Sequence, residues 1–384
     1  MAGKGKDVVQ EKGVNEYGDG VAWIRGPMLG KGSFGRVYLA TLKNPTSQYS
    51  CFPSVMAVKS AEVSVSGTIQ KEKEVMSNLN VCPYLIKCFG EETTMGENGV
   101  MAYNLLLEYG SGGTLADRIK KSGSNGLPEL EVKMHSRSIL SGLNHIHDLG
   151  YVHCDLKPDN ILLVRTAESG GITEFRAKIG DFGLAKKEKQ SKKRKLEPCW
   201  RGTLRYLSPE AVIDYVQEAP CDVWAIGCIV LEMLTGKPPW EGEKAEDILA
   251  KIRAGNEFPK IPNEISNEAR DFLKCCFVRK SIYRLNCEML LNHPFVEDLD
   301  SDDLYKSDDD LSDDLFAYEL DDGSEDDSSS YWCEEDADSM DDEPGCSSAE
   351  VVDIEGDENC RKSEIHIGRL KSREHFPTNF TYLA

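Results

Sequence analysis

The sequence predicts an α+β fold with two lobes, a small β-rich N-terminal lobe that contains one helix and a larger, mainly helical C-terminal lobe. Three observations lead to this prediction. Short β-rich runs around a glycine-rich turn fill residues 21–110, segments with helical spacing fill residues 111–296, and an acidic stretch follows them. We expect residues 1–20 to form a short polar segment and residues 297–384 to form a tail without a fold of its own.

The net charge of −21 combines two very different parts of the chain. Residues 297–358 contain 28 acidic side chains and one basic side chain, Lys306, whereas the rest of the chain carries a charge of +6. The acidic stretch has too few apolar residues to offset the entropy of ordering, and its charges repel one another. We therefore expect a slightly basic globular body followed by a disordered acidic tail.

Composition also excludes several classes of protein. The longest apolar run, Val223–Leu231, is far shorter than the roughly 20 residues that a membrane helix needs. Residues 1–13 contain no apolar stretch typical of a secretory signal. The 13 cysteines are scattered and odd in number, so we interpret them as reduced, mostly buried thiols. We therefore expect a protein of the cytoplasm or the nucleus, or of both, with no membrane partner.

In the N-terminal lobe, residues 21–40 predict a strand, a tight glycine turn and a second strand. The helical spacing of Val75, Met76 and Leu79 predicts a helix over Gln70–Leu79, with Glu72 beside its apolar face. Further strands are predicted at Ser54–Lys59, Leu85–Phe89 and Val100–Glu108, and a glycine-rich connection at residues 110–113 ends the lobe.

Helical patterns dominate the C-terminal lobe. Apolar residues at spacings of three and four predict a helix over Glu129–Leu149, and the nearly uniform apolar character of Asp222–Gly236 predicts a buried helix. The other predicted elements are short strands at Asn160–Val164 and Ala177–Gly180 with a polar insert at 166–176 between them, helices at Ala245–Ala254, Asn267–Phe277 and Cys287–Leu291, and an end of ordered structure at His293–Val296.

A glycine-rich motif, Gly-x-Gly-x-x-Gly-x-Val, lies in the first predicted hairpin. Glycines allow the backbone to close over phosphate groups, so that amide N–H groups can face the negatively charged oxygens. Taken alone, the motif is equally compatible with a hairpin that binds no ligand. The candidate nucleotide-binding residues of this motif are Leu29, Gly30, Lys31, Gly32, Ser33, Phe34, Gly35, Arg36 and Val37.

A lysine and a glutamate follow the glycine motif at a suggestive spacing. Lys59 ends the predicted strand that contains Ala57, 24 residues after Gly35, and Glu72 lies 13 residues later on the predicted helix. A lysine that contacts the phosphates of a nucleotide needs a carboxylate partner to hold its long side chain. The sequence therefore predicts that Glu72 pairs with Lys59.

Three motifs in the C-terminal lobe indicate the chemistry. They are His-Cys-Asp-Leu-Lys-Pro-Asp-Asn at residues 153–160, Asp-Phe-Gly at 181–183 and Ser-Pro-Glu at 208–210. Together with the motifs above, and in this order along residues 24–296, they resemble the signature set of the eukaryotic protein kinases. The resemblance covers about 70% of the chain. It implies the bilobal protein kinase fold, binding of ATP and Mg²⁺, and phosphorylation of a protein substrate.

The resemblance implies a role for each polar residue of these motifs. Asp155 is expected to accept the hydrogen bond and the proton of the substrate hydroxyl, and Lys157 to place a cation near the γ-phosphate. Asn160 and Asp181 are expected to bind Mg²⁺, which prefers oxygen ligands. Lys157 and Thr203 together resemble the serine/threonine branch of the family rather than the tyrosine branch.

The resemblance also implies an adenine site between the lobes. Leu107 would be the gatekeeper behind the adenine, and backbone groups of Glu108 and Gly110 would bond to its edge. The side chains expected on the two faces of the adenine are Leu29, Val37, Ala57 and Leu162.

Two further matches to the family are expected to hold the fold. Asp222 would anchor the backbone of the 153–160 segment from the buried helix, and Arg284 would pair with Glu210. A buried charge needs such a partner because its removal from water costs free energy. We therefore interpret these residues as structural rather than catalytic.

Two residues depart from the family pattern. Cys154 stands where most members have an arginine that binds a phosphate on the activation segment and couples it to the catalytic aspartate. A thiol cannot form that charged, bidentate contact, so we expect activity that does not depend on such a phosphate. Ser208 replaces an alanine before Pro209, a pattern also seen in related kinases.

Closer placement rests on the segments Trp-Ile-Arg-Gly at 23–26, Leu-Glu-Tyr-Gly-Ser-Gly-Gly at 107–113 and Gly-Thr-Leu-Arg-Tyr-Leu-Ser-Pro-Glu at 202–210. They resemble the short MAP kinase kinase kinases of plants, which have a C-terminal tail. This resemblance implies phosphorylation of MAP kinase kinases in stress or hormone signalling. Two alternatives stay open, a pseudokinase scaffold, against which the intact Lys59 and Asp155 argue, and a protein that binds partners through its acidic tail.

The activation segment, residues 181–210, carries seven basic side chains and one acidic side chain between Lys186 and Lys195. This cluster is compatible with a nuclear import signal, with a docking patch for acidic partners or with a solvated loop. It lacks interleaved aromatic residues, so we expect no nucleic-acid partner. Opposite charges attract over about a Debye length, ~8 Å, so the acidic tail could contact this cluster and restrain substrate access; the alternative is a tail that contacts nothing.

Overall fold

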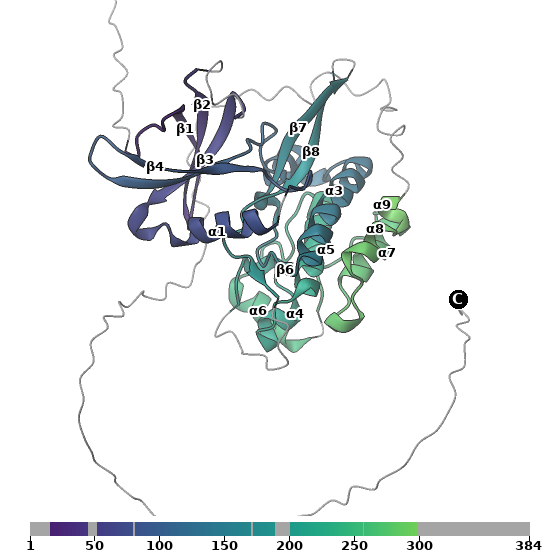
Figure 1. Ribbon diagram of the computed structural model, residues 1–384. Coiled ribbons are helices and arrows are strands. Elements are labelled where there is room, and N and C mark those ends of the chain that lie inside the picture. Colours follow the sequence, from purple (N-terminus) through teal and green to yellow (C-terminus); the bar gives the residue numbers. More distant parts are fainter. Residues whose placement is uncertain are drawn as a thin grey trace, which may run out of the picture. The chain divides into compact units, whose positions relative to one another are not determined.

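The computed structural model describes residues 16–44, 52–79, 81–169, 172–188, 200–255 and 257–297. The expectations for residues 1–15, for the basic residues after Glu188 and for the tail after Glu297 lie outside these ranges. Within them the chain forms the predicted α+β fold, a β-sheet lobe followed by a helical lobe (Figure 1). In the part of the chain that the structure describes, none of the helices combines the length and the apolar composition that a membrane crossing requires.

The N-terminal lobe is built on a five-stranded antiparallel sheet in the order β1-β2-β3-β5-β4. Trp23, Met56 and Val58 are fully buried in one small core of this lobe. Burial of alternate side chains on one face fixes the register, because a slip by one residue would move them all to the other face. The strands are β1 (Trp23–Gly32), β2 (Gly35–Leu42), β3 (Val55–Glu62), β4 (Cys88–Met95) and β5 (Met101–Leu107).

The strand predicted at Leu85–Phe89 is wrong in its bounds, because β4 begins at Cys88 and continues to Met95. Leu85 and Ile86 are instead buried in the main core, where Leu85 forms a parallel bridge with Ile179 of the other lobe. β4 itself is largely polar and half-exposed, so no alternation of apolar side chains marks it in the sequence. Its backbone pairing with β5 makes it a strand.

The predicted helix of the N-terminal lobe is α1 (Gly67–Asn78), which packs beside the sheet (Figure 1). Ile69, Val75 and Met76 bury its apolar side, and Glu72 is buried among them, with 1% of the residue exposed. A carboxylate in such surroundings requires a partner, since burial of an unpaired charge is very costly. α1 therefore carries one charged side chain of the candidate site into the interior.

The C-terminal lobe is organised around two long helices, α3 (Glu129–Asp148) and α5 (Ala219–Thr235), which pack against each other. Nearly every residue of α5 is buried, as its apolar sequence predicts. The predicted bounds of α6 and α8 are confirmed, whereas α2 and α4 are too short to produce a clear helical pattern. The shorter helices are α2 (Leu115–Ser122), α4 (Pro209–Asp214), α6 (Ala245–Ala254), α7 (Asn267–Cys276), α8 (Cys287–Leu291) and α9 (Pro294–Glu297).

β7 (Ile161–Ser169) and β8 (Ile172–Ile179) form a long antiparallel hairpin (Figure 1). The polar insert predicted at 166–176 is wrong, because both strands continue into it. The side chains at 165–166 and 174–176 are exposed or half-exposed, so no buried face marks these strands in the sequence. Ile161 and Ile179 are fully buried and keep the base of the hairpin in the core.

Candidate active site

The glycine-rich motif forms the hairpin between β1 and β2. Gly32 pairs with Gly35, so that Ser33 and Phe34 form the turn. Gly35 has a φ of +148°, and a Cβ atom there would lie 2.6 Å from the carbonyl oxygen of Ser60, which only glycine permits. Along the motif, Leu29, Gly30, Lys31, Gly32 and Ser33 are exposed, whereas Phe34, Gly35, Arg36 and Val37 are half-buried.

Lys59, which pairs with Val37 across the sheet, lies at the centre of an ion-pair network. Its Nζ atom lies 2.8 Å from Oε2 of Glu72 on α1 and 2.9 Å from Oδ1 of Asp181. Burial alone would lower the pKa of Lys59, but the two carboxylates raise it above its ordinary value. At Asp181 the same ammonium outweighs burial and lowers the pKa of the carboxyl. The predicted contact between Lys59 and Glu72 is confirmed, and Lys59 and Asp181 are both charged at neutral pH.

The second oxygen of Glu72 connects α1 to the Asp-Phe-Gly motif. Glu72 Oε1 accepts a hydrogen bond from the backbone N–H of Phe182 at 3.2 Å. Phe182 is fully buried against His153, with 5.3 Å between the ring centroids. Asp181 adopts a left-handed backbone conformation with φ +57°, which costs free energy for a residue other than glycine. A strained residue held by several surrounding contacts is typical of a functional site.

Asp155 shares hydrogen bonds with its polar neighbours. Its Oδ1 atom accepts from the N–H of Thr203 at 3.0 Å and from the Thr203 hydroxyl at 2.8 Å. Lys157 Nζ lies 3.4 Å from Asp155 Oδ2 and donates to the Thr203 hydroxyl oxygen at 3.0 Å. Asn160 donates to the Asp155 carbonyl oxygen at 2.8 Å. The structure thus brings together a carboxylate that can accept a proton and a cation that can stabilise negative charge beside it.

Asn160 and Asp181 present oxygen atoms suited to a magnesium ion. The amide nitrogen of Asn160 is committed to Asp155, so its carbonyl oxygen is the atom that can bind a cation. In Asp181, Oδ1 contacts Lys59 and the N–H of Gly183, and 36% of the side chain is exposed. Amide and carboxylate oxygens are ligands that Mg²⁺ prefers. This donor set fits the ion that the resemblance implies.

Two pairs of the residues expected around an adenine are brought together. Ala57 pairs with Leu107 across β3 and β5. Gly110 lies so close to Leu162 that a Cβ on the glycine would be 3.0 Å from the Cβ of Leu162. The N–H of Glu108 already donates to a carbonyl of the protein at 2.8 Å, so its own carbonyl is the backbone group that can meet an adenine edge.

Asp222 anchors the 153–160 segment as predicted. Its carboxylate accepts hydrogen bonds from the backbone N–H groups of His153, at 2.8 Å, and Cys154, at 3.1 Å. Nε2 of His147 lies 2.9 Å from the same carboxylate. Burial would raise the pKa of Asp222, but His147 and the backbone donors hold it below its ordinary value. The backbone that carries Asp155 is therefore fixed from the first turn of α5.

We expect the His147–Asp222 contact to make the protein less stable at alkaline pH. Burial alone would lower the pKa of His147, but its hydrogen bond to Asp222 raises it to about 10. Because the folded pKa exceeds the unfolded value of about 6.5, the contact contributes stability that is fully present below about pH 6.5 and is lost as the pH rises through about 10. The loss should be a few kcal/mol.

Urea unfolding at several pH values between about 6.5 and 10 measures this loss. The variant His147→Gln keeps a donor for Asp222 but does not titrate, so its free energy of unfolding should fall less over this range. An equal decline in both proteins would contradict the assignment.

The two departures from the family pattern are both buried. Cys154 has a φ of +68°, and burial raises the pKa of its thiol well above the ordinary value, so the thiol is neutral. The hydroxyl of Ser208 has no hydrogen-bond partner among the described residues.

Sequence reasoning missed Gln217, because a single glutamine forms no motif. Its side-chain amide forms hydrogen bonds with the backbone of Arg201.

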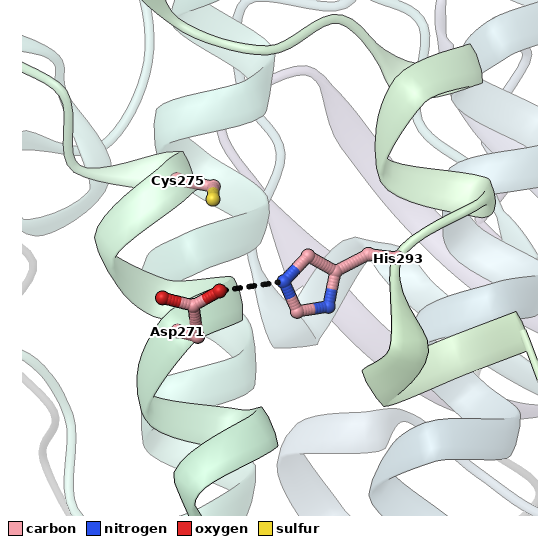
Figure 2. Close-up of side chains that lie close together, drawn as sticks. All are labelled: Asp271, Cys275 and His293. Atoms are coloured by element: carbon pink, nitrogen blue, oxygen red, sulfur yellow. Dashed lines mark ion pairs between the residues drawn. The ribbon is translucent and has the colours of Figure 1, made fainter. Parts of the chain in front are cut away.

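A second group of potential metal ligands, Asp271, Cys275 and His293, lies outside these motifs (Figure 2). Nδ1 of His293 accepts a hydrogen bond from the N–H of Phe295 at 3.1 Å, so the neutral ring carries its proton on Nε2. That nitrogen faces Oδ2 of Asp271 at 3.4 Å. To bind a metal ion through Nε2, the ring would have to leave Nε2 unprotonated and donate from Nδ1 instead. Here Nδ1 accepts a hydrogen bond. The group is therefore a contact between α7 and the residue before α9 rather than a metal site.

The comparison with known proteins agrees with these motifs. Residues 23–296 match a family model described as protein kinase domain. Mitogen-activated protein kinase kinase kinase 20 from Arabidopsis thaliana is 42% identical over 287 residues, which are 73% of this chain and 80% of that protein. Mitogen-activated protein kinase kinase kinase 17 from the same plant is 38% identical over 71% of this chain and 69% of that protein. Mitogen-activated protein kinase kinase kinase 18 is 36% identical over 82% of this chain and 90% of that protein. The family match includes every residue placed in the site above.

Proposed function

Because the chain belongs to the protein kinase family, we propose that it is a MAP kinase kinase kinase, which phosphorylates MAP kinase kinases in stress or hormone signalling. The chain is a serine/threonine protein kinase, a class of enzyme that generally uses ATP with Mg²⁺. Similarity to three plant proteins named as MAP kinase kinase kinases supports the finer proposal, since it extends over at least 69% of each of them.

The observation that carries the catalytic part of the proposal is the network of Lys59, Glu72 and Asp181. Buried charges cost free energy unless each has a partner, and here one ammonium lies within 2.9 Å of two carboxylates. Asp155 and Lys157 form a second charged pair at 3.4 Å. A scaffold that only binds partners would not need these charges, and neither would a protein that acts only through its acidic tail. The network therefore favours an active enzyme over both alternatives.

In the proposed reaction, ATP supplies the phosphoryl group and Mg²⁺, when bound, neutralises its developing charge. Asn160 and Asp181 would hold the ion through their available oxygens. Lys59, held by Glu72, would contact the nucleotide phosphates. Asp155 would accept the hydrogen bond of a substrate serine or threonine hydroxyl and take its proton.

Three further groups would orient the reactants. Lys157 would stabilise the negative charge near the γ-phosphate, and its hydrogen bond to Thr203 keeps its ammonium beside Asp155. The carbonyl of Glu108 and the N–H of Gly110 would bond to the adenine edge. The side chains that would enclose the adenine are Leu29, Val37, Ala57 and Leu162, with Leu107 behind it.

An assay with purified protein tests the proposal. The substrate is a MAP kinase kinase that carries an inactivating substitution, so that only this chain can phosphorylate it. We expect Lys59→Met to lower the rate of phosphate transfer by about 10²-fold or more, because the variant lacks the positive charge that would stabilise the transition state. The matched control is Lys73→Met, which removes a lysine of α1 that pairs with Glu91 on the surface and should keep full activity.

The assay tests the kinase activity and the identity of the substrate separately. Equal activity of wild type and Lys59→Met would contradict the assignment of Lys59. Transfer to a generic protein substrate but to no MAP kinase kinase would remove the finer proposal and leave the kinase activity. Mass spectrometry of the product should place the phosphate on serine or threonine.

A further inference from the structure

One contact beneath the activation segment is formed by an uncharged side chain, that of Gln217. We propose that Gln217 is a positioning residue that holds residues 201–203 over Asp155, so that the substrate side of the active site forms without a phosphate. Gln217 lies between α4 and α5, and only 4% of it is exposed. It is not among the residues that would contact ATP or the substrate hydroxyl, so it acts through the segment that it holds.

The amide of Gln217 forms two hydrogen bonds with one residue. Its Oε1 atom accepts from the N–H of Arg201 at 2.9 Å, and its Nε2 atom donates to the Arg201 carbonyl oxygen at 2.8 Å. Donation and acceptance by one neutral planar group is a property of amide side chains, whereas a carboxylate only accepts. The ring of Trp200 adds a second neutral contact, since it stacks on Tyr215 with 6.2 Å between centroids.

The two residues after Arg201 transmit this anchor to the catalytic aspartate. Gly202 has a φ of +98°, and a Cβ on it would lie 2.3 Å from the carbonyl oxygen of Cys154, so the backbone of the activation segment rests directly on the catalytic segment. Thr203 then bonds to Asp155 through both its N–H and its hydroxyl. A displacement of about 1 Å at such a position can lower a rate by about 10²-fold.

Gln217 and Asp222 connect two parts of the active site to one helix. Asp222, in the first turn of α5, holds the N–H groups of His153 and Cys154. Gln217, which precedes α5, holds Arg201. Because nearly all of α5 is buried, it belongs to the part of the lobe that opens least readily. The segments that carry Asp155 and Thr203 are therefore positioned relative to the same rigid element.

The two departures from the family pattern lie beside this anchor. Cys154, Ser208 and Gln217 line one cavity of about 10 Å³, together with Thr203, Cys221 and the acidic residues Asp155 and Asp222. A cavity of this size holds at most about one water molecule, so these side chains are closely packed. The thiol of Cys154 is neutral, as are the serine hydroxyl and the glutamine amide. The contact between Gln217 and Arg201 thus adds an uncharged link where other family members use an arginine and a phosphate. It lies beside the charged contacts that Asp155 and Lys157 make with Thr203.

The variant Gln217→Met tests the proposal, because methionine fills a similar volume but cannot bond to the Arg201 backbone. With a generic protein substrate we expect kcat/KM to fall about tenfold or more, while KM for ATP stays within about twofold because the Lys59 network is untouched. Hydrogen exchange of the backbone N–H groups of residues 201–203 should become faster, and that of residues 153–160 should stay slow. If this variant does not fold, Gln217→Glu gives the same test, since it keeps the acceptor and loses the donor.

The matched control is Ser266→Ala, which removes the N-cap of α7. It should lower the melting temperature and leave both KM values and the exchange at residues 201–203 unchanged. Because a generic substrate is used, the result does not depend on the proposed MAP kinase kinase substrate.

Treatment of the wild-type enzyme with phosphatase provides the second arm of the test. We expect the dephosphorylated enzyme to keep most of its activity. A loss of tenfold or more, ~1.4 kcal/mol of barrier, would show that a phosphate is needed and would overturn the proposal. The proposal also fails if Gln217→Met alters neither the kinetics with protein substrate nor the exchange at residues 201–203.

Discussion

Replacement of Asp181 by asparagine should lower phosphate transfer by about 10²–10³-fold and leave the fold intact. Asparagine has nearly the same shape, but its neutral amide is a poorer ligand for Mg²⁺ than a carboxylate. It also removes one of the two charges that hold Lys59, whose Nζ lies 2.9 Å from Asp181 Oδ1. The substitution weakens both the magnesium site and the hold on Lys59, so its effect on phosphate transfer should be one of the largest that a single substitution can produce here.

Turnover of purified Asp181→Asn should be compared with that of wild type at saturating ATP, with circular dichroism as the test of folding. A suitable control is Asp247→Asn, because Asp247 is exposed on α6 and is not in the site. If the Asp181 variant turns over at the wild-type rate, the assignment of Asp181 as a metal ligand is wrong.

Replacement of Arg284 by methionine should lower the free energy of unfolding by about 3–5 kcal/mol. The predicted pair with Glu210 is confirmed, with nitrogen–oxygen distances of 2.6 Å and 3.1 Å. The Arg284 side chain is fully buried, that of Glu210 is 9% exposed, and the guanidinium lies over the ring of Trp224 at 5.2 Å. The variant would leave the carboxylate of Glu210 buried and without its main partner, which is why the cost is large.

Urea unfolding of wild type and Arg284→Met measures this cost. The control Lys237→Met breaks a surface pair with Glu241 whose side chains are about half-exposed, and should cost less than about 1 kcal/mol. The double variant Arg284→Met, Glu210→Leu should be more stable than Arg284→Met alone, because no unpaired charge remains. A loss below about 1 kcal/mol for Arg284→Met would show that the pair contributes little.

The predictions that succeeded rest on patterns within short stretches of chain. The apolar spacing of α3 and the uniform apolar run of α5 are dictated by how a helix buries its surface, and both helices are where they were predicted, within a few residues. The glycine turn was predictable because backbone sterics permit few residues there. In contrast, the bounds of β4 and the outer part of the β7–β8 hairpin were predicted wrongly, because most of their side chains are exposed or half-exposed and show no alternation of apolar residues.

Residue types and their order along the chain were enough to identify Lys59, Asp155 and Asp181 as a set, because each stands in a short motif that resembles one of the protein kinase family. Their distances, and the strained backbone of Asp181, follow only from the packing of α1 and β3 against the 181–183 segment. The role of Gln217 and the proton position on His293 likewise depend on contacts between residues far apart in the sequence or on the local backbone. Such neutral hydrogen bonds carry no sequence signature, since many residues could form them and only the folded chain determines which ones do.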